Sequence, residues 1–248
     1  MIQQLKHVKK INHNKSYSGF TLVELMFSML FISLLVISIT MTIMQIIGIY
    51  NRGILMKEVN QVGRTVTDQM QRTIGASTPS STVNVVKLTN PANSSEITGG
   101  RFCLGNYSYI YNFAKTLKET SVTTQNKIGS NGPKIGFIRV ADEGGQYCMP
   151  NNDGVYSVIP AAAEKVDMLS GGAYSLTLYD LSVVSAAKSY DSISGQRLYY
   201  INITLGTSDY KAIDVDNGKR CKAPSEEGSD QNYCSISGFS FVARAGNI

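Results

Sequence analysis

The most constraining feature of the chain is a run of 26 residues without a formal charge, from Leu25 to Tyr50, made mostly of Leu, Ile, Met, Val and Phe. As an α-helix, this run would be about 39 Å long at about 1.5 Å per residue, which exceeds the roughly 30 Å hydrocarbon core of a bilayer. A single carboxylate, Glu24, directly precedes the run. A charge inside a membrane costs about 2.5–3.5 kcal/mol on insertion scales. The run predicts a membrane-spanning helix, and the position of Glu24 requires an explanation.

The segment before the apolar run differs in composition from the rest of the chain. It holds four of the 23 basic residues and no acidic residue before Gly19. Removing those four leaves 19 basic against 18 acidic residues, a net charge of +1. Nucleic acid is therefore the less favoured kind of partner. The four residues are Lys6, Lys9, Lys10 and Lys15.

Both histidines, His7 and His13, also lie in this leading segment. The remaining chain therefore cannot form a Ser-His-Asp or Cys-His catalytic site, or a histidine-ligated metal site. Catalysis by carboxylates alone stays formally open, but nothing in the sequence favours it. We expect a protein that is not an enzyme and that carries no cofactor.

Two ordinary interpretations of the apolar run are available. An uncleaved signal anchor would leave the lysines on one side and Arg52 on the other, which gives a modest positive-inside bias. A secretory signal peptide fits poorly, because the run is too long for its apolar core and no small-residue cleavage site follows.

A third interpretation comes from the residues around Glu24. The stretch Gly19-Phe20-Thr21-Leu22-Val23-Glu24-Leu25, preceded by a short lysine-rich leader, resembles the type IV pilin family, which includes the pseudopilins of type II secretion and competence systems. In that family a membrane peptidase cuts after the glycine and methylates the new amino terminus. The resemblance implies cleavage between Gly19 and Phe20, N-methylation of Phe20, and Glu24 as the fifth mature residue.

The resemblance also implies a role for Glu24 in assembly. Opposite charges removed from water compensate each other only when they are closely paired. Glu24 could meet the Phe20 amine of its own helix or that of a neighbouring subunit, and the family's filaments are thought to use the neighbour. The alternative is a carboxylate that is merely tolerated near the membrane edge.

The helical pattern continues beyond Tyr50. Apolar residues recur at steps of three and four, which predicts one face of an amphipathic helix that packs on the protein's own sheet rather than in a partner's groove. A stop signal follows at Gly75 and Ser77-Thr78-Pro79. No proline interrupts Phe20 to Pro79, unlike many major pilins, so we expect local softening only at glycines. The apolar positions are Leu55, Val59, Val62, Val66, Met70 and Ile74, and the glycines are Gly48, Gly53 and Gly63.

The remainder of the chain reads as β-rich, with alternating apolar residues and turn-rich stretches. We expect strands at Val83–Leu88, Arg101–Phe113, Ile135–Ala141, Tyr174–Tyr179, Tyr199–Leu205 and around Phe239 and Phe241, a brief helix at Ala161–Leu169, and turns at Asn90–Gly100, Asn126–Pro133 and Asn151–Gly154.

The predicted fold is α+β: a long N-terminal helical spine, transmembrane in its first half and amphipathic in its second, packed against an antiparallel β-sheet head. The predicted segments are a cleaved leader (1–19), a transmembrane half (20–50), an amphipathic half (51–79) and a head (80–248). We expect no second domain.

The four cysteines favour disulfides formed in an oxidising compartment. They are Cys103, Cys148, Cys221 and Cys234. Nearest-neighbour pairing would join the first two and the last two, but four cysteines allow three connectivities. Zinc is the less favoured alternative, because the spacings are irregular and no histidine accompanies them. The polar stretch between the last two cysteines resembles the cysteine-bounded C-terminal loop of many pilins, which often faces outward on the filament.

Two further motifs have competing interpretations. Asp214, Asp216 and Asn217 offer oxygen ligands for calcium, as in some major pseudopilins, but they lack the spacing of a full calcium loop. A hairpin turn at Asn217-Gly218 explains them more simply. The tyrosines of SYIYN and RLYY could form an adhesive or DNA-stacking surface. Core and cross-strand packing is the favoured alternative.

The predicted function is that of a minor pilin or pseudopilin, a structural subunit that helps initiate or cap a filament for motility, secretion or DNA uptake. The 229 residues after Gly19 and the ending SFVARAGNI are similar to minor pilins of the W/J-like type. The alternative is a filament-displayed adhesin or DNA-binding module. The expected partners are other pilin subunits, the assembly platform, prepilin peptidase and the lipid bilayer. We expect a single pass through the cytoplasmic membrane with the head outside the cytoplasm, then a cell-surface or periplasmic filament.

Overall fold

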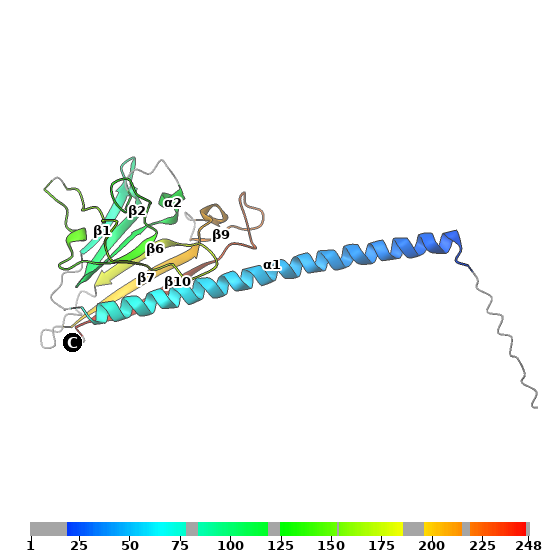
Figure 1. Cartoon of the computed structure of the whole chain (residues 1–248), viewed down its shortest axis with the longest axis horizontal. Coiled ribbons are helices and arrows are strands. Elements are labelled where there is room, and N and C mark those ends of the chain that lie inside the picture. The colour runs from blue at the N-terminus through cyan, green and yellow to red at the C-terminus, as the bar shows by residue number, and fades with distance from the viewer. Residues whose placement is uncertain are drawn as a thin grey trace, which may run out of the picture. The chain divides into compact units, whose positions relative to one another are not determined.

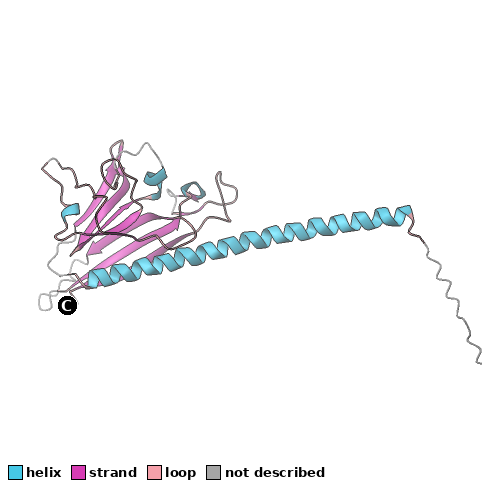
Figure 2. Cartoon of the chain, in the orientation of Figure 1, coloured by secondary structure: helices cyan, strands magenta, loops and turns pink. Residues whose placement is uncertain are grey.

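The computed structural model describes residues 19–77, 84–118, 125–152, 154–185, 196–214 and 219–246. One long N-terminal helix, α1 (Leu22–Gly75), packs against antiparallel β-sheets, so the predicted α+β class is confirmed (Figures 1 and 2). The chain divides into two compact units, residues 1–47 and residues 48–248, which are described separately below. The predicted leader lies outside the described residues except for Gly19.

The second half of α1 belongs to the larger unit and buries one face. All six apolar positions of the predicted stripe are buried, none more than 7 % exposed. Their spacing places them on one side of the helix, and five of the six join the main hydrophobic core. Burying each such side chain contributes roughly 1.5–3 kcal/mol. The prediction that this stripe packs on the protein's own sheets is confirmed.

The head contains a five-stranded antiparallel sheet with the order β1-β2-β3-β4-β5. Consecutive strands are neighbours, so the sheet is a simple meander. Its strands are β1 (Asn84–Asn90), β2 (Asn93–Leu104), β3 (Tyr107–Asn112), β4 (Phe137–Ala141) and β5 (Lys165–Asp167).

A second, three-stranded antiparallel sheet has the order β10-β7-β6. Figure 1 shows β10 beside the second half of α1, and the Gln71 side chain there donates to the Val242 carbonyl at 3.2 Å. An isolated parallel bridge between Phe113 and Leu178 links the two sheets. The remaining elements are β6 (Leu176–Ser185), β7 (Arg197–Thr207), β10 (Ile236–Ala245), the small pair β8 (Ile213–Asp214) and β9 (Arg220–Cys221), and the short helices α2 (Ala114–Lys118), η1 (Gln146–Cys148) and η2 (Tyr210–Ala212).

The main core lies between the second half of α1 and the two large sheets. It contains aromatic residues of the five-stranded sheet and aliphatic residues of the three-stranded sheet. A smaller cluster around Ile110, Ile138 and Ile159 also includes Ile135 and Val140. The apolar stripe of α1 therefore packs against side chains from two sheets. The sequence predicted a single sheet in this place.

A buried arginine of β2 holds two connections of the head, one before β4 and one between β4 and β5. Arg101 is 6 % exposed and donates to the Asn126 side chain at 2.9 Å and to the carbonyls of Tyr147 and Ser157 at 2.8 and 2.7 Å. Its guanidinium also lies over the Tyr156 ring. Burial disfavours the charged form and lowers the pKa of Arg101 to about 10. The carbonyl acceptors compensate for part of that cost.

Two predicted strand boundaries were wrong. Residues 101–113 were expected as one strand, but the chain turns at Gly105, whose φ of 60° suits glycine, and forms the β2–β3 hairpin. Residues 90–100 were expected as a turn, but β2 begins at Asn93 and pairs with β1. The polar Asn-Ser-Ser composition misled the prediction, because cross-strand pairing overrides local propensity.

The predicted helix at Ala161–Leu169 was also wrong. Residues 161–163 form a turn, and β5 pairs with β4, with Val166 opposite Arg139. The alanine run favours a helix locally. Pairing with β4 gives the backbone of β5 its hydrogen-bond partners. A helix as short as this one would be only marginally stable by itself.

Candidate functional site

The candidate site begins where α1 starts. Thr21 precedes the first helical residue, and its hydroxyl accepts a hydrogen bond from the Glu24 backbone N–H at 3.3 Å. In return, the Glu24 carboxylate accepts from the Thr21 backbone N–H at 3.5 Å and from its hydroxyl at 3.4 Å. This reciprocal arrangement is a capping box, which satisfies N–H groups that the helix itself leaves unpaired.

The capping box was missed by the sequence analysis, although the Thr-x-x-Glu pattern was present at the start of an apolar run. It gives Glu24 a local role that was not considered. A carboxylate in the first turn also interacts favourably with the helix dipole. The nitrogen that the carboxylate contacts belongs to Thr21; cleavage after Gly19 would create an amine one residue earlier, at Phe20.

Gly19 and Phe20 precede α1 and are exposed; Phe20 is 79 % exposed. A Cβ built on Gly19 meets no atom of the described residues within 4 Å. The described part of the chain therefore gives Gly19 no packing role. A requirement for glycine at this position would come from another molecule that handles the peptide bond.

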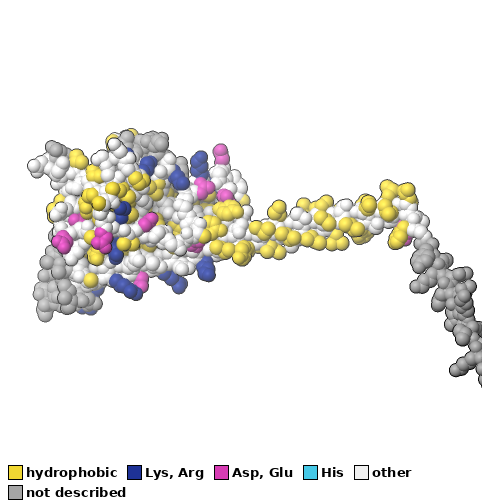
Figure 3. Space-filling model, in the orientation of Figure 1, with side chains coloured by type: hydrophobic (Ala, Val, Ile, Leu, Met, Phe, Trp, Pro, Cys, Tyr) yellow, Lys and Arg dark blue, Asp and Glu magenta, His cyan; other side chains and the backbone are white. Residues whose placement is uncertain are grey.

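The first half of α1 exposes its apolar side chains. Every residue from Gly19 to Ile47 is exposed, and Figure 3 shows hydrophobic side chains along this part of the helix. Among the described residues, α1 is the one helix whose length and composition would allow it to cross a membrane.

Most hydroxyl groups in this half are satisfied within the helix. Four of them donate to backbone carbonyls three or four residues earlier, at 2.7–3.0 Å. Such bonds let a helix leave water without unpaired hydroxyl donors. The donors are Ser28, Ser33, Thr40 and Thr42.

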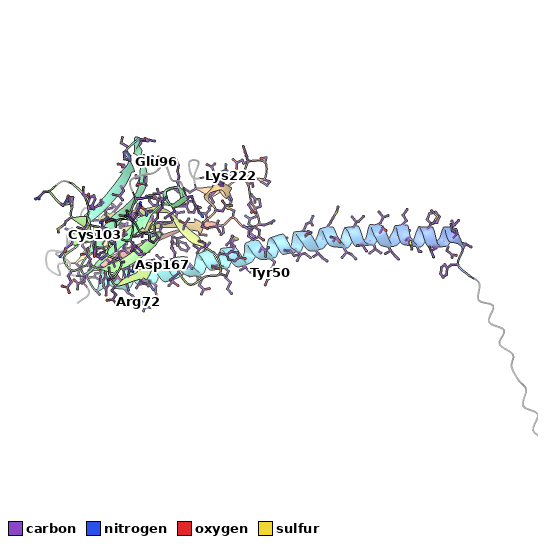
Figure 4. All side chains as sticks on the ribbon, turned by 45° about the horizontal axis from the view of Figure 1, so that its top comes forward. Tyr50, Arg72, Glu96, Cys103, Asp167 and Lys222 are labelled. Atoms are coloured by element: carbon purple, nitrogen blue, oxygen red, sulfur yellow. A yellow bond between two sulfur atoms is a disulfide. The ribbon has the colours of Figure 1, made fainter. Side chains whose placement is uncertain are left out.

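The four cysteines form two disulfides, Cys103–Cys148 and Cys221–Cys234, the nearest-neighbour pairing. The first joins β2 to η1; Figure 4 labels Cys103. The second closes the loop of residues 222–233, called the C-terminal loop below. No cysteine is free. Each thiol is used in a bridge, so the pairing leaves none for zinc.

The C-terminal loop is organised by hydrogen bonds to its own ends. The Gln231 side chain and the Ser229 hydroxyl both donate to the Lys222 carbonyl. Asp230 accepts from the backbone N–H groups of Asn232 and Tyr233 at 3.1 and 3.2 Å. The loop thus has a defined shape despite its mostly polar composition.

One end of the C-terminal loop lies against α1. The Asn51 side chain donates to the Tyr233 hydroxyl at 3.5 Å, and a Cβ added to Gly48 would lie 2.7 Å from the Asn232 side-chain oxygen. Sequence reasoning missed this contact, since two segments 182 residues apart carry no shared pattern.

The calcium hypothesis gains no support. Asp214 interacts with Arg220, whose guanidinium lies 3.3 Å from its carboxylate and 3.1 Å from that of Glu226. Asp216, Asn217 and the proposed Asn217-Gly218 turn lie outside the described residues. Within the described ranges, no group of three or more His, Cys, Asp or Glu side chains could hold a metal ion.

The tyrosines proposed as a stacking surface are mostly in the core. Tyr109 and Tyr199 are fully buried and Tyr111 is 2 % exposed, whereas Tyr200 is exposed. Burial raises the pKa of Tyr109 to about 12. These rings pack within the protein, as the alternative interpretation expected.

No protein-family model, curated protein or solved structure matches this chain.

Proposed function

We propose that this chain is a minor pilin or pseudopilin, a non-enzymatic subunit that inserts in a membrane, is cut after Gly19 and helps initiate or cap a pilus-like filament. The main support for the proposal is that the Gly19–Leu25 stretch lies at the start of a 54-residue helix. The first half of this helix is apolar, and its second half packs on β-sheets. This arrangement supports a subunit whose helix serves first as an anchor and then as an assembly element.

The two disulfides support a head that matures in an oxidising compartment. A head outside the cytoplasm, a single pass through the inner membrane and a later place in a filament are part of the proposal. The proposed partners are prepilin peptidase, other pilin subunits and the assembly platform. The alternative is a filament-displayed adhesin or DNA-binding module; three of the four tyrosines that could give it a stacking surface are buried.

The decisive experiment compares Glu24→Ala with Glu24→Gln. Alanine removes both the carboxylate charge and the capping box, whereas glutamine retains a side chain that can complete the box. If the charge pairs with an incoming amine, both variants should be cleaved normally and both should fail to enter filaments. Breaking a buried pair costs about 3–5 kcal/mol. The measurement is the amount of processed protein that co-purifies with sheared filaments.

If Glu24→Gln enters filaments at the wild-type level while Glu24→Ala does not, the carboxylate acts as a cap and the charge-pairing role is wrong. If Glu24→Ala also enters at the wild-type level, Glu24 has no role in assembly. Thr21→Ala is the matched control, because it breaks the capping box and keeps the charge. The charge-pairing role predicts that Thr21→Ala enters filaments.

A further inference from the structure

The C-terminal loop meets α1 at one particular level. The contacts of Asn232 with Gly48 and of Tyr233 with Asn51 place the loop on the helical turn that begins at Gly48. The preceding residues, Leu25 to Ile47, carry no charge. The loop therefore adjoins the last turn of the uncharged run, where a membrane-spanning segment would reach the lipid head groups.

Two tyrosine rings are exposed at this level. Tyr50 on α1 is 66 % exposed and Tyr233 in the loop is 49 % exposed. Figure 4 labels Tyr50 on the helix and Lys222 at the start of the loop. Tyrosine is enriched at membrane–water interfaces because its ring is apolar and its hydroxyl stays hydrated. Exposed rings at the end of an apolar run are suited to that environment.

Charged groups in the C-terminal loop limit how deeply this part of the protein can enter the hydrocarbon core of a bilayer. The loop carries three carboxylates and one ammonium group, and Arg52 follows on the helix. Lys222 donates to the Glu227 carbonyl at 2.9 Å, which holds its charge within the loop. Charges are costly in hydrocarbon. The carboxylates are Glu226, Glu227 and Asp230.

We propose that Tyr50 and the C-terminal loop form an interfacial collar, a surface that contacts the head-group region of the bilayer and sets the depth of α1. The inference rests on the membrane-spanning part of the proposed function and adds a lipid-contacting surface to it. The loop is net negative, so attraction to anionic lipid does not drive the contact. The collar should form on a zwitterionic phosphatidylcholine surface.

The chain contains no tryptophan, so single tryptophan substitutions give unambiguous fluorescence reporters. Tyr233→Trp reports on the collar. Tyr200→Trp is the matched control, because Tyr200 has the same 49 % exposure. Tyr200 pairs with Val242, which contacts Gln71. Gln71 lies about 30 Å further along α1 than Asn51 at about 1.5 Å per residue.

The experiment places the full chain in phosphatidylcholine vesicles whose acyl chains are brominated close to the head group, and compares quenching with that in unbrominated vesicles. Phe31→Trp, inside the apolar run, controls for membrane insertion. We expect Phe31→Trp and Tyr233→Trp to lose fluorescence and Tyr233→Trp to emit at shorter wavelength on vesicle binding. Tyr200→Trp should be unaffected by bromine.

If Phe31→Trp is quenched but Tyr233→Trp behaves like Tyr200→Trp, the collar is wrong and the membrane anchor stands. If Phe31→Trp is not quenched either, the anchor itself is wrong, and the collar fails with it. Equal quenching of Tyr233→Trp and Tyr200→Trp would also overturn the collar, since it would show a head that lies on the membrane without a defined level.

Discussion

At the scale of single residues, two glycines of α1 occupy opposite environments. Gly63 is buried, and a Cβ built on it would collide with the tip of the Phe239 ring. Gly53 is exposed, and a Cβ there meets no atom within 4 Å. Both were expected only to soften the helix. Gly63 instead permits close approach of β10.

We expect Gly63→Ala and Gly53→Ala to change stability in opposite directions. Both remove a helix-interior glycine, a gain of up to about 1 kcal/mol. Gly63→Ala also overpacks the contact with Phe239, a cost of typically 1–3 kcal/mol. Thermal unfolding of the full chain in detergent should show a lower midpoint for Gly63→Ala and an equal or higher one for Gly53→Ala. Similar stabilisation by both would show that the Phe239 contact is unimportant.

The sequence singled out Glu24 for one role and contained a second role that was overlooked. The offset from Gly19 drew attention to charge pairing between subunits. The second role is the capping box, which needs only a threonine three residues before the glutamate at the start of a helix. Local rules of this kind can be read from a sequence directly. A partner supplied by another subunit cannot, because its position depends on assembly.

At the scale of elements, the two disulfides stabilise different parts of the head. Cys221–Cys234 closes a separation of 13 residues and Cys103–Cys148 one of 45. Chain-entropy estimates give about 3 and about 4 kcal/mol respectively. The Cys221–Cys234 bridge closes the C-terminal loop. In the Cys103–Cys148 bridge, which joins β2 to η1, both cysteines are buried.

Replacing both Cys221 and Cys234 by Ser should loosen the C-terminal loop selectively. Hydrogen–deuterium exchange should become faster in residues 222–233 and stay unchanged in the buried second half of α1, because the core stripe does not depend on the loop. Replacing both Cys103 and Cys148 by Ser is the control and should lower global stability more. Equal protection of the loop with and without its bridge would contradict this assignment.

The α1 stripe was predictable because its helical period of apolar residues is long and uninterrupted. The predicted helix at residues 161–169 failed for the opposite reason. Its three alanines give a short local preference, and β5 is held by pairing with residues Ile138 to Val140. Pairing between distant strands leaves no periodic signal in one of them alone.

At the scale of the whole chain, the class was predictable and the number of sheets was not. An apolar helix followed by alternating strands indicates α+β. The division into a five-stranded and a three-stranded sheet depends on which strand pairs with which. The Phe113–Leu178 bridge and the shared core then join the two sheets through contacts between residues far apart in sequence.

The central claim is that the chain is cut between Gly19 and Phe20 before it enters a filament. Gly19→Val tests it, because the side chain would enter open space in this structure and so would not disturb the fold. We expect uncleaved precursor to accumulate in the membrane. Gly53→Val is the control in another open glycine position, and it should be cleaved normally.

The most direct measurement is the mass and terminal sequence of the wild-type protein recovered from filaments. The account predicts a chain that begins at N-methylated Phe20. A filament-borne chain that still begins at Met1, or that begins beyond the apolar run, would contradict it.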